Sequence, residues 1–252
     1  MPAWLHAFRA SFTFLTRIPV GGFPYPNDTW KWITIWFPLV GLFLGGLAAG
    51  LSFILPSSIS FFSRAILIVG LGMLITGGFH EDGLGDTADA LGGAYDREGV
   101  LRILKDSRIG AFGALAIVII VLLRISLLAD LETKMWLGLL LGQSLSRAAS
   151  VLQLAIIPYA RREDEKSKSR DVAISGPIQA ASAVFWMSAI LCSAGYFGLP
   201  ASTTIGIVGA ILLSLLVLSW RFYRRLGGIT GDFLGCTQQI SEVAILIALV
   251  CA

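Results

Sequence analysis

The chain is organised by apolar segments that are each about as long as the hydrocarbon core of a bilayer is thick. A helix needs roughly 20 apolar residues to cross that core. Inside lipid every backbone N–H and C=O must be satisfied within the protein, so such segments have to be helical. The sequence therefore predicts an all-α, polytopic integral membrane bundle of six to seven transmembrane helices. The expected spans are residues 33–55, 60–79, 110–129, 135–158, 174–198 and 201–220, and the last apolar run, 243–252, completed by residues before it.

The overall composition agrees with a bundle embedded in the lipid bilayer. Hydrophobic residues make up 56% of the chain and charged residues only 14%, whereas about 25% charged residues is usual for a soluble domain. The net charge of +3 comes without a basic tract interleaved with aromatic residues, so no nucleic-acid partner is expected. Because no linker or shift in composition divides the chain, residues 1–252 are predicted to form a single membrane-embedded domain.

The N-terminal segment, residues 3–18, has a different pattern from the spans. Trp4, Phe8 and Phe12 recur along one helical face, with Arg9 away from it. This spacing predicts an amphipathic helix that lies in the membrane interface and does not cross the bilayer.

Glycine spacing in the first span indicates how that helix packs. Gly41 and Gly45, and likewise Gly46 and Gly50, form small-xxx-small pairs. Such pairs let two membrane helices approach closely, so both are interpreted as packing positions and not as part of a ligand site.

The distribution of basic residues predicts the orientation of the spans. Fifteen of the nineteen Lys and Arg fall in four segments, namely the N-terminal region, 80–109, 159–171 and 221–240. The turns between these segments contain only Arg64 and Lys134. Because positively charged loops stay on the cytoplasmic side, the four basic segments are expected to share that side.

The most unusual polar feature is a row of carboxylates after the second span. Asp82, Asp86 and Asp89 are spaced i, i+4 and i+7, with Glu81 on the flank, so a helix would gather three carboxylates on one face. Like charges at this spacing repel each other. A hard divalent cation such as Mg²⁺ would resolve the conflict, because it takes oxygen ligands and commonly bridges carboxylates to a substrate phosphate.

A second acidic stretch, residues 227–242, is expected on the same side of the membrane. In it Asp232 is surrounded by glycines, which allow backbone amides to approach an anion. The stretch alone is equally well explained as a loop and helix cap. Two acidic, Gly-flanked stretches on one side favour a shared metal and phosphate site.

Several basic residues are candidate phosphate ligands, each with a structural alternative. Arg147 lies near the middle of the fourth span, where it either binds a substrate phosphate or forms a buried salt bridge. Lys105, Ser107 and Arg108 either hold a diphosphate or anchor the next span. Arg124, nearer the outer end of its span, is expected to snorkel.

His80 adjoins the carboxylate row and has two interpretations. As a neighbour of Glu81 and Asp82 it could act as a general base or orient a metal ligand. A lone histidine is otherwise most often structural.

The motifs together resemble those of a known family. They are GGFHEDGLGDTADALGG, then Asp96–Arg97 and KDSRIGAFG, and GGITGDFLGCTQQISE near the C-terminus, with TRIP at Thr16–Pro19 and the Ser146–Arg147 pair. The chain is similar over essentially its whole length to the cobalamin synthases, membrane-bound adenosylcobinamide-GDP ribazoletransferases.

The resemblance implies a reaction. It implies that α-ribazole or its 5′-phosphate is joined to adenosylcobinamide-GDP, with release of GMP, to give adenosylcobalamin or its phosphate. The resemblance also implies a requirement for Mg²⁺ and a multi-pass protein of the bacterial cytoplasmic membrane whose active site faces the cytoplasm.

The resemblance also implies a role for each candidate residue. The expected metal ligands are Asp82, Asp86, Asp89 and Asp232, the expected catalytic residues are Asp82, Asp86, Glu81 and His80, and the expected substrate contacts are Lys105, Ser107, Arg108 and Arg147.

Three alternative functions would each leave a different sequence pattern. A CDP-alcohol phosphotransferase is the main one, but Asp82–Gly83 is not followed by the Ala-Arg of that family. An aromatic prenyltransferase would carry Asn-Asp-x-x-Asp, which is not present. A cation transporter would place its acids at mid-membrane in two matching halves, whereas here they gather in one segment.

The charge distribution makes a prediction about topology. A reporter fused after Ser167, in a basic segment, is expected in the cytoplasm, and one fused after Glu132 is expected outside. Paired fusions to alkaline phosphatase and a fluorescent protein measure both locations. The reverse pattern would contradict a shared cytoplasmic side for the basic segments.

Overall fold

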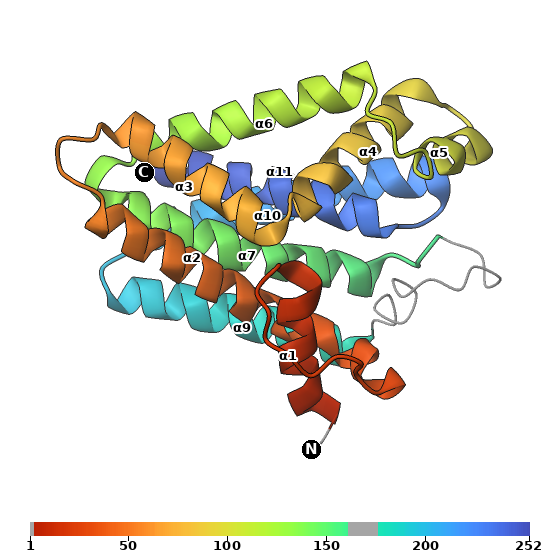
Figure 1. Ribbon diagram of the computed structural model, residues 1–252, viewed down its shortest axis with the longest axis horizontal. Coiled ribbons are helices and arrows are strands. Elements are labelled where there is room, and N and C mark those ends of the chain that lie inside the picture. Colours follow the sequence, from red (N-terminus) through yellow and green to blue (C-terminus); the bar gives the residue numbers. More distant parts are fainter. Residues whose placement is uncertain (1–2, 161–175) are drawn as a thin grey trace.

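The predicted spans form helices that lie side by side with alternating direction (Figure 1). The computed structural model describes residues 3–160 and 176–252. The α-helices of the described residues are α1 (Ala3–Leu15), α2 (Phe37–Ile54), α3 (Phe61–Thr76), α4 (Phe79–Gly93), α5 (Arg97–Ile103), α6 (Ala111–Asp130), α7 (Met135–Ile156), α9 (Pro177–Tyr196), α10 (Ala201–Leu226) and α11 (Gly231–Val250). Two 3₁₀ helices, η1 (Asn27–Trp36) and η2 (Glu132–Lys134), precede α2 and α7.

The predicted class and number of spans are confirmed. Among the described residues, six helical segments are long and apolar enough to cross a bilayer, and a seventh results if the bent pair α3 and α4 counts as one span. These six segments are built on α2, α6, α7, α9, α10 and α11. The protein is therefore an all-α polytopic membrane bundle.

The second span differs from its prediction. Residues 60–79 were expected to cross as one straight helix, but α3 ends at Thr76 after 16 residues and α4 continues at 88° to it. At about 1.5 Å per residue, 16 residues reach about 24 Å, which is short of a hydrocarbon core of roughly 30 Å. The bend occurs at Gly77 and Gly78, whose φ angles of 68° and 67° end one helix and begin the next.

The second polar stretch is also more helical than predicted. Residues 227–242 could be explained as a loop and helix cap, but α10 continues to Leu226 and α11 already begins at Gly231. Thr230 caps α11 by accepting a hydrogen bond from the backbone N–H of Phe233. The last span thus begins well before residue 243, as expected, and its first half carries polar side chains into the bundle.

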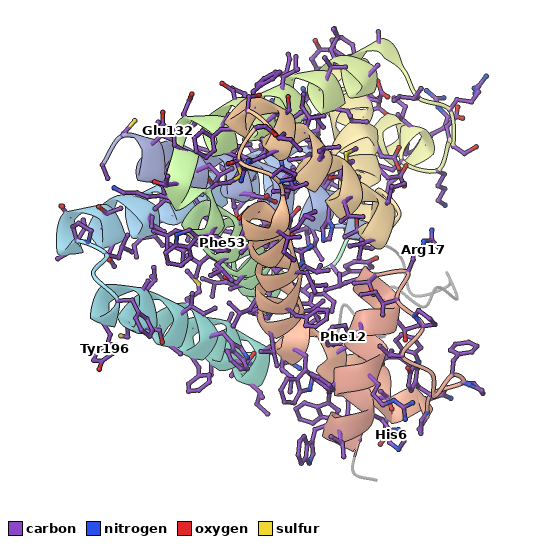
Figure 2. The ribbon with its side chains drawn as sticks, turned by 60° about the vertical axis from the view of Figure 1, so that its left-hand side comes forward. His6, Phe12, Arg17, Phe53, Glu132 and Tyr196 are labelled. Carbon is purple, nitrogen blue, oxygen red and sulfur yellow. The ribbon has the colours of Figure 1, made fainter. Side chains whose placement is uncertain are left out.

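The described basic segments lie at one end of the bundle. Figure 1 shows that α5 and the connection between α10 and α11 share this end, whereas the turns after α2, α6 and α9 lie at the other. Figure 2 likewise separates Arg17 from Glu132 and Tyr196. Residues 161–171 of the predicted basic segment 159–171 lie outside the described residues.

The N-terminal segment is a helix, as predicted, and α1 crosses the bundle axis instead of following it (Figure 1). It packs on η1 and α2. Phe12 and Leu15 are buried, whereas Trp4 is half exposed and stacks on Trp36. The guanidinium of Arg9 donates a hydrogen bond to the carbonyl oxygen of Val20.

One of the two glycine pairs in α2 forms the predicted close contact. A Cβ atom at Gly45 would lie 2.6 Å from the carbonyl oxygen of Leu139, and one at Gly41 would collide with the carbonyl oxygen of Gln143. The prediction for Gly46 and Gly50 is wrong, because both face open space. Helix α2 therefore packs closely against α7 along the face that contains Gly41 and Gly45. This contact fixes the position of α7 at the centre of the bundle.

The two glycine pairs provide a matched test of this packing. Gly41→Ala should lower the melting temperature in detergent by several degrees, because the added methyl group meets backbone that cannot move aside, at an overpacking cost of about 1–3 kcal/mol. Gly46→Ala makes the same chemical change in open space and should leave the melting temperature unchanged or slightly raised. Equal melting temperatures for the two variants would contradict the contact.

Candidate active site

The site is built on the contact between α4 and α11, whose backbones touch at two glycines. A Cβ atom at Gly83 would lie 2.9 Å from the carbonyl oxygen of Asp232. One at Gly235 would lie 3.3 Å from the carbonyl oxygen of His80. Because neither glycine carries a side chain, the two acidic stretches come together as the sequence predicts.

The predicted carboxylate row lies on α4 and is joined by Asp232 from α11. Asp82 is exposed, and Asp86 and Asp232 are partly buried. The charges of Asp82, Asp232 and Asp89 all act on the carboxylate of Asp86, which is itself partly withdrawn from water. In the described part of the chain no three acidic, His or Cys side chains already surround a common point as metal ligands do. A bound cation would have to draw these carboxylates closer together.

Asp89 has a further partner. Its carboxylate accepts hydrogen bonds from the backbone N–H groups of Gly110 at 2.7 Å and Gly113 at 2.8 Å. These groups belong to the first turn of α6, where unsatisfied amides and the helix dipole attract an anion. Asp89 therefore holds α4 against the N-terminus of α6, which the sequence pattern did not reveal.

A buried ion network lies beneath the carboxylate row. Arg124 of α6 pairs with Glu81 of α4 at 2.9 Å and with Glu242 of α11 at 3.2 Å, and all three side chains are buried. The expectation that Arg124 snorkels to the membrane surface is wrong. Two acids inside the bundle neutralise Arg124, so its guanidinium has no reason to reach for water.

Glutamine side chains extend the network across α11. Gln239 donates to Glu81 at 3.1 Å and to the side-chain oxygen of Gln238 at 3.0 Å. Gln238 in turn donates to Glu242 at 2.8 Å and to the hydroxyl of Ser146 at 2.9 Å. The two glutamine side chains of α11 thus find hydrogen-bond partners within the protein.

Arg147 is buried as predicted, but its partner is an amide and not a carboxylate. It donates to the backbone carbonyl of Gln143 at 2.8 Å and to its side-chain oxygen at 2.9 Å, and Gln143 donates to Glu242 at 2.7 Å. Among the described residues Arg147 forms no ion pair, and its Nε atom has no hydrogen-bond partner. A buried cation without an anionic partner is a candidate ligand for a substrate anion.

His80 is buried beside Arg147. The two residues line the same two cavities, one between α2, α3 and α7 and the other beside Phe14, Phe37 and Phe79. The ring of His80 contacts that of Phe79 edge to face. The structure thus brings together two of the predicted site residues inside the bundle.

The predicted phosphate ligands of the KDSRIG motif lie elsewhere, in the exposed connection between α5 and α6. Lys105, Ser107 and Arg108 are all exposed. The hydrogen bond from Arg108 lowers the pKa of the Asp106 carboxyl to about 2, so this pair stays charged at neutral pH. None of the three lines the two cavities, although they lie at the same end of the bundle as the carboxylate row.

Two network residues, Arg124 and Glu242, were not predicted as site residues. Glu242 is the last residue of the polar stretch 227–242, in which only Asp232 was singled out, and Arg124 was expected to snorkel and therefore to need no partner. The available signal was one acid and one base, each inside an apolar segment, since intramembrane charges generally pair.

These features define a polytopic, all-α membrane protein with an acidic face at one end of its bundle and a buried ion network below it. Residues 7–250 match the sequence profile of the cobalamin-5-phosphate synthases. The chain belongs to this family, which confirms the resemblance of its motifs.

Three relatives named adenosylcobinamide-GDP ribazoletransferase cover nearly the whole chain. The protein of Shewanella amazonensis is 38% identical over 97% of this chain and 95% of its own. That of Shewanella piezotolerans is 34% identical over 99% and 97%, and that of Leptothrix cholodnii is 36% identical over 97% and 96%. No solved structure is significantly similar.

The ion network can be tested by removing its cation. Arg124→Gln leaves Glu81 and Glu242 buried without a counter-charge, so the protein should lose about 3–5 kcal/mol of stability. Thermal unfolding in detergent measures the loss. Arg108→Gln, which breaks an exposed pair, is the control and should hardly change the melting temperature. Equal effects of the two substitutions would refute a structural role for the network.

Proposed function

We propose that this protein joins α-ribazole, or its 5′-phosphate, to adenosylcobinamide-GDP with release of GMP. The observation that carries the proposal is the match to the family over residues 7–250, with relatives named adenosylcobinamide-GDP ribazoletransferase at 34–38% identity. The acidic face and the buried arginines provide the chemistry that joining a hydroxyl to a phosphorus atom needs: ligands for a metal, a proton acceptor and cations for phosphate.

Asp82, Asp86 and Asp232 are the proposed ligands of Mg²⁺. They are carboxylates, which suit a hard cation, and their mutual repulsion on one face favours binding of a positive charge. When bound, Mg²⁺ would neutralise the diphosphate and the departing GMP. Asp89 is proposed to orient α4 and α6 instead, because both of its oxygens already accept backbone amides.

Glu81 is the proposed acceptor of the ribose hydroxyl proton. Arg124 and Gln239 contact its Oε1 atom, whereas its Oε2 atom is buried and has no hydrogen-bond partner among the described residues. Glu81 also lines the groove that contains Asp82. The free oxygen is therefore next to the acidic face, while the ion pair with Arg124 holds the carboxylate in place.

Arg147 is proposed to contact substrate phosphate, supported by its burial without an anionic partner among the described residues. Lys105, Ser107 and Arg108 are proposed as outer phosphate contacts, which requires their exposed connection to close over bound substrate. The acidic end is proposed to face the cytoplasm of a bacterial inner membrane, as the basic segments at that end suggest.

One experiment tests the activity directly. The protein purified in detergent is incubated with adenosylcobinamide-GDP, α-ribazole or its 5′-phosphate, and Mg²⁺, and GMP is quantified by chromatography. GMP formation that requires both substrates and stops on chelation of the metal is the expected result. Absence of GMP with a folded, lipid-supplemented protein would overturn the proposal.

Asp86 provides a sharper test of the metal ligands. Asp86→Asn removes one ligand charge and one repulsion together, so GMP release should fall by a large factor at all substrate concentrations. Without metal the variant should be as stable as the wild type or more stable. Mg²⁺ should raise the melting temperature of the wild type more than that of the variant, because a ligand of the native state stabilises by mass action.

Asp28→Asn is the matched control for this test. Asp28 is exposed in η1 and lines neither the groove beside Asp82 nor the two cavities at Arg147. Its substitution should change neither turnover nor the thermal response to Mg²⁺. Normal turnover by Asp86→Asn, or equal Mg²⁺ protection of wild type and Asp86→Asn, would refute the metal assignment.

A further inference from the structure

An open groove adjoins the acidic face at the point where the N-terminal segment meets the bend between α3 and α4. It has a volume of about 520 Å³. Its lining comes from α1 and the residues after it, from the end of α3 and the bend, and from α4 and α6. The polar and charged residues that line it are Thr13, Thr16, Arg17, Thr76, Glu81 and Asp82.

Arg17 is placed at this groove by two features of the bend. Its backbone N–H donates to the carbonyl oxygen of Ile75 at 2.7 Å, which ties the segment after α1 to the end of α3. A Cβ atom at Gly77 would collide with the Nε atom of Arg17, so the guanidinium lies directly over a residue without a side chain. Figure 2 shows Arg17 at this junction of the N-terminal segment with α4.

The charges around the groove are not paired with one another. Among the described residues the guanidinium of Arg17 forms no ion pair and no hydrogen bond, and its side chain is exposed. Glu81 is neutralised by Arg124. The exposed carboxylate of Asp82 therefore supplies the negative charge of the groove, and Arg17 supplies its positive charge.

A groove that contains a positive and a negative side chain not paired with each other suits a ligand that carries both positive and negative charge. A diphosphate bound to a divalent cation is such a ligand, since its metal attracts carboxylates and its free oxygens accept hydrogen bonds from a guanidinium. Lipid is a poor occupant for this position, because half of the groove lining is polar and charged.

We propose that Arg17 binds the diphosphate of a nucleoside-diphosphate-linked substrate in this groove, with the metal on the side of Asp82. The assignment rests on the proposed function for the nature of the substrate. It gives the N-terminal segment a role in substrate binding, because packing of Phe12 and Leu15 in α1 holds Arg17 at the bend.

The test measures binding as well as turnover. Binding of radiolabelled GDP with Mg²⁺ to the purified full-length protein is measured by equilibrium dialysis, for wild type, Arg17→Gln, Arg17→Lys and Arg102→Gln. Arg102 is exposed at the same end of the bundle, in the last turn of α5, and does not line the groove. Its substitution makes the same change of charge outside the proposed site.

Arg17→Gln should weaken binding of Mg²⁺–GDP at least roughly tenfold, which is the size expected for loss of a charge-assisted hydrogen bond. Arg17→Lys should show an intermediate loss, because it keeps the charge and loses the planar fork. Arg102→Gln should bind as the wild type does. In the transferase assay Arg17→Gln should raise KM for adenosylcobinamide-GDP and leave KM for ribazole unchanged.

The outcomes separate this proposal from the proposed function. Unchanged Mg²⁺–GDP binding in Arg17→Gln, an equal loss in Arg102→Gln, or no binding by the wild type overturns the groove assignment. Binding that depends on Arg17 in a protein that releases no GMP supports the groove and refutes the transferase reaction. If Arg17→Gln melts well below the wild type, Arg17→Lys decides, and full binding by that variant counts against the assignment.

Discussion

The pairing of Arg124 with Glu81 and Glu242 is the interaction on which the site depends. Each ion would be costly to bury alone, so the three side chains must stay together once the bundle has formed. They come from α6, α4 and α11, which are separate in sequence and pack on one another around this contact. Loss of any one charge would leave another uncompensated. The network therefore fixes the relative position of the three helices.

Neighbouring residues in α4 couple this network to the acidic face. Glu81 and Asp82 are adjacent in sequence, so on a helix their side chains point about 100° apart. Glu81 is buried in the network and Asp82 is exposed in the groove. Fixing the first residue therefore fixes the orientation of the second, and of Asp86 one turn later. The bend at Gly77 and Gly78 permits this arrangement, because it turns α4 by 88° from α3 and α4 then packs on α11 and α6.

The sequence alone was sufficient to predict the features that depend on local chemistry. The lengths of the apolar segments predicted the spans, and the i, i+4, i+7 spacing predicted a helix for Asp82, Asp86 and Asp89. The pairing of Arg124 was missed because its partners lie 43 and 118 positions away along the chain, and no local pattern reports such a contact. The end of α3 was missed for a different reason. Hydropathy continues through Phe79, and only backbone conformation at two glycines ends the helix.

The buried charges also explain why Arg147 differs from Arg124. Inside the bundle two carboxylates, Glu81 and Glu242, face two guanidinium groups, so the set is neutral as a whole. Both carboxylates lie within ion-pair distance of Arg124, whereas Arg147 reaches Glu242 only through Gln143. The less neutralised positive charge is therefore that of Arg147, which lines the cavities it shares with His80. An anion entering there would find a guanidinium already held in place by Gln143 and only partly neutralised, which costs less reorganisation than separating an existing ion pair.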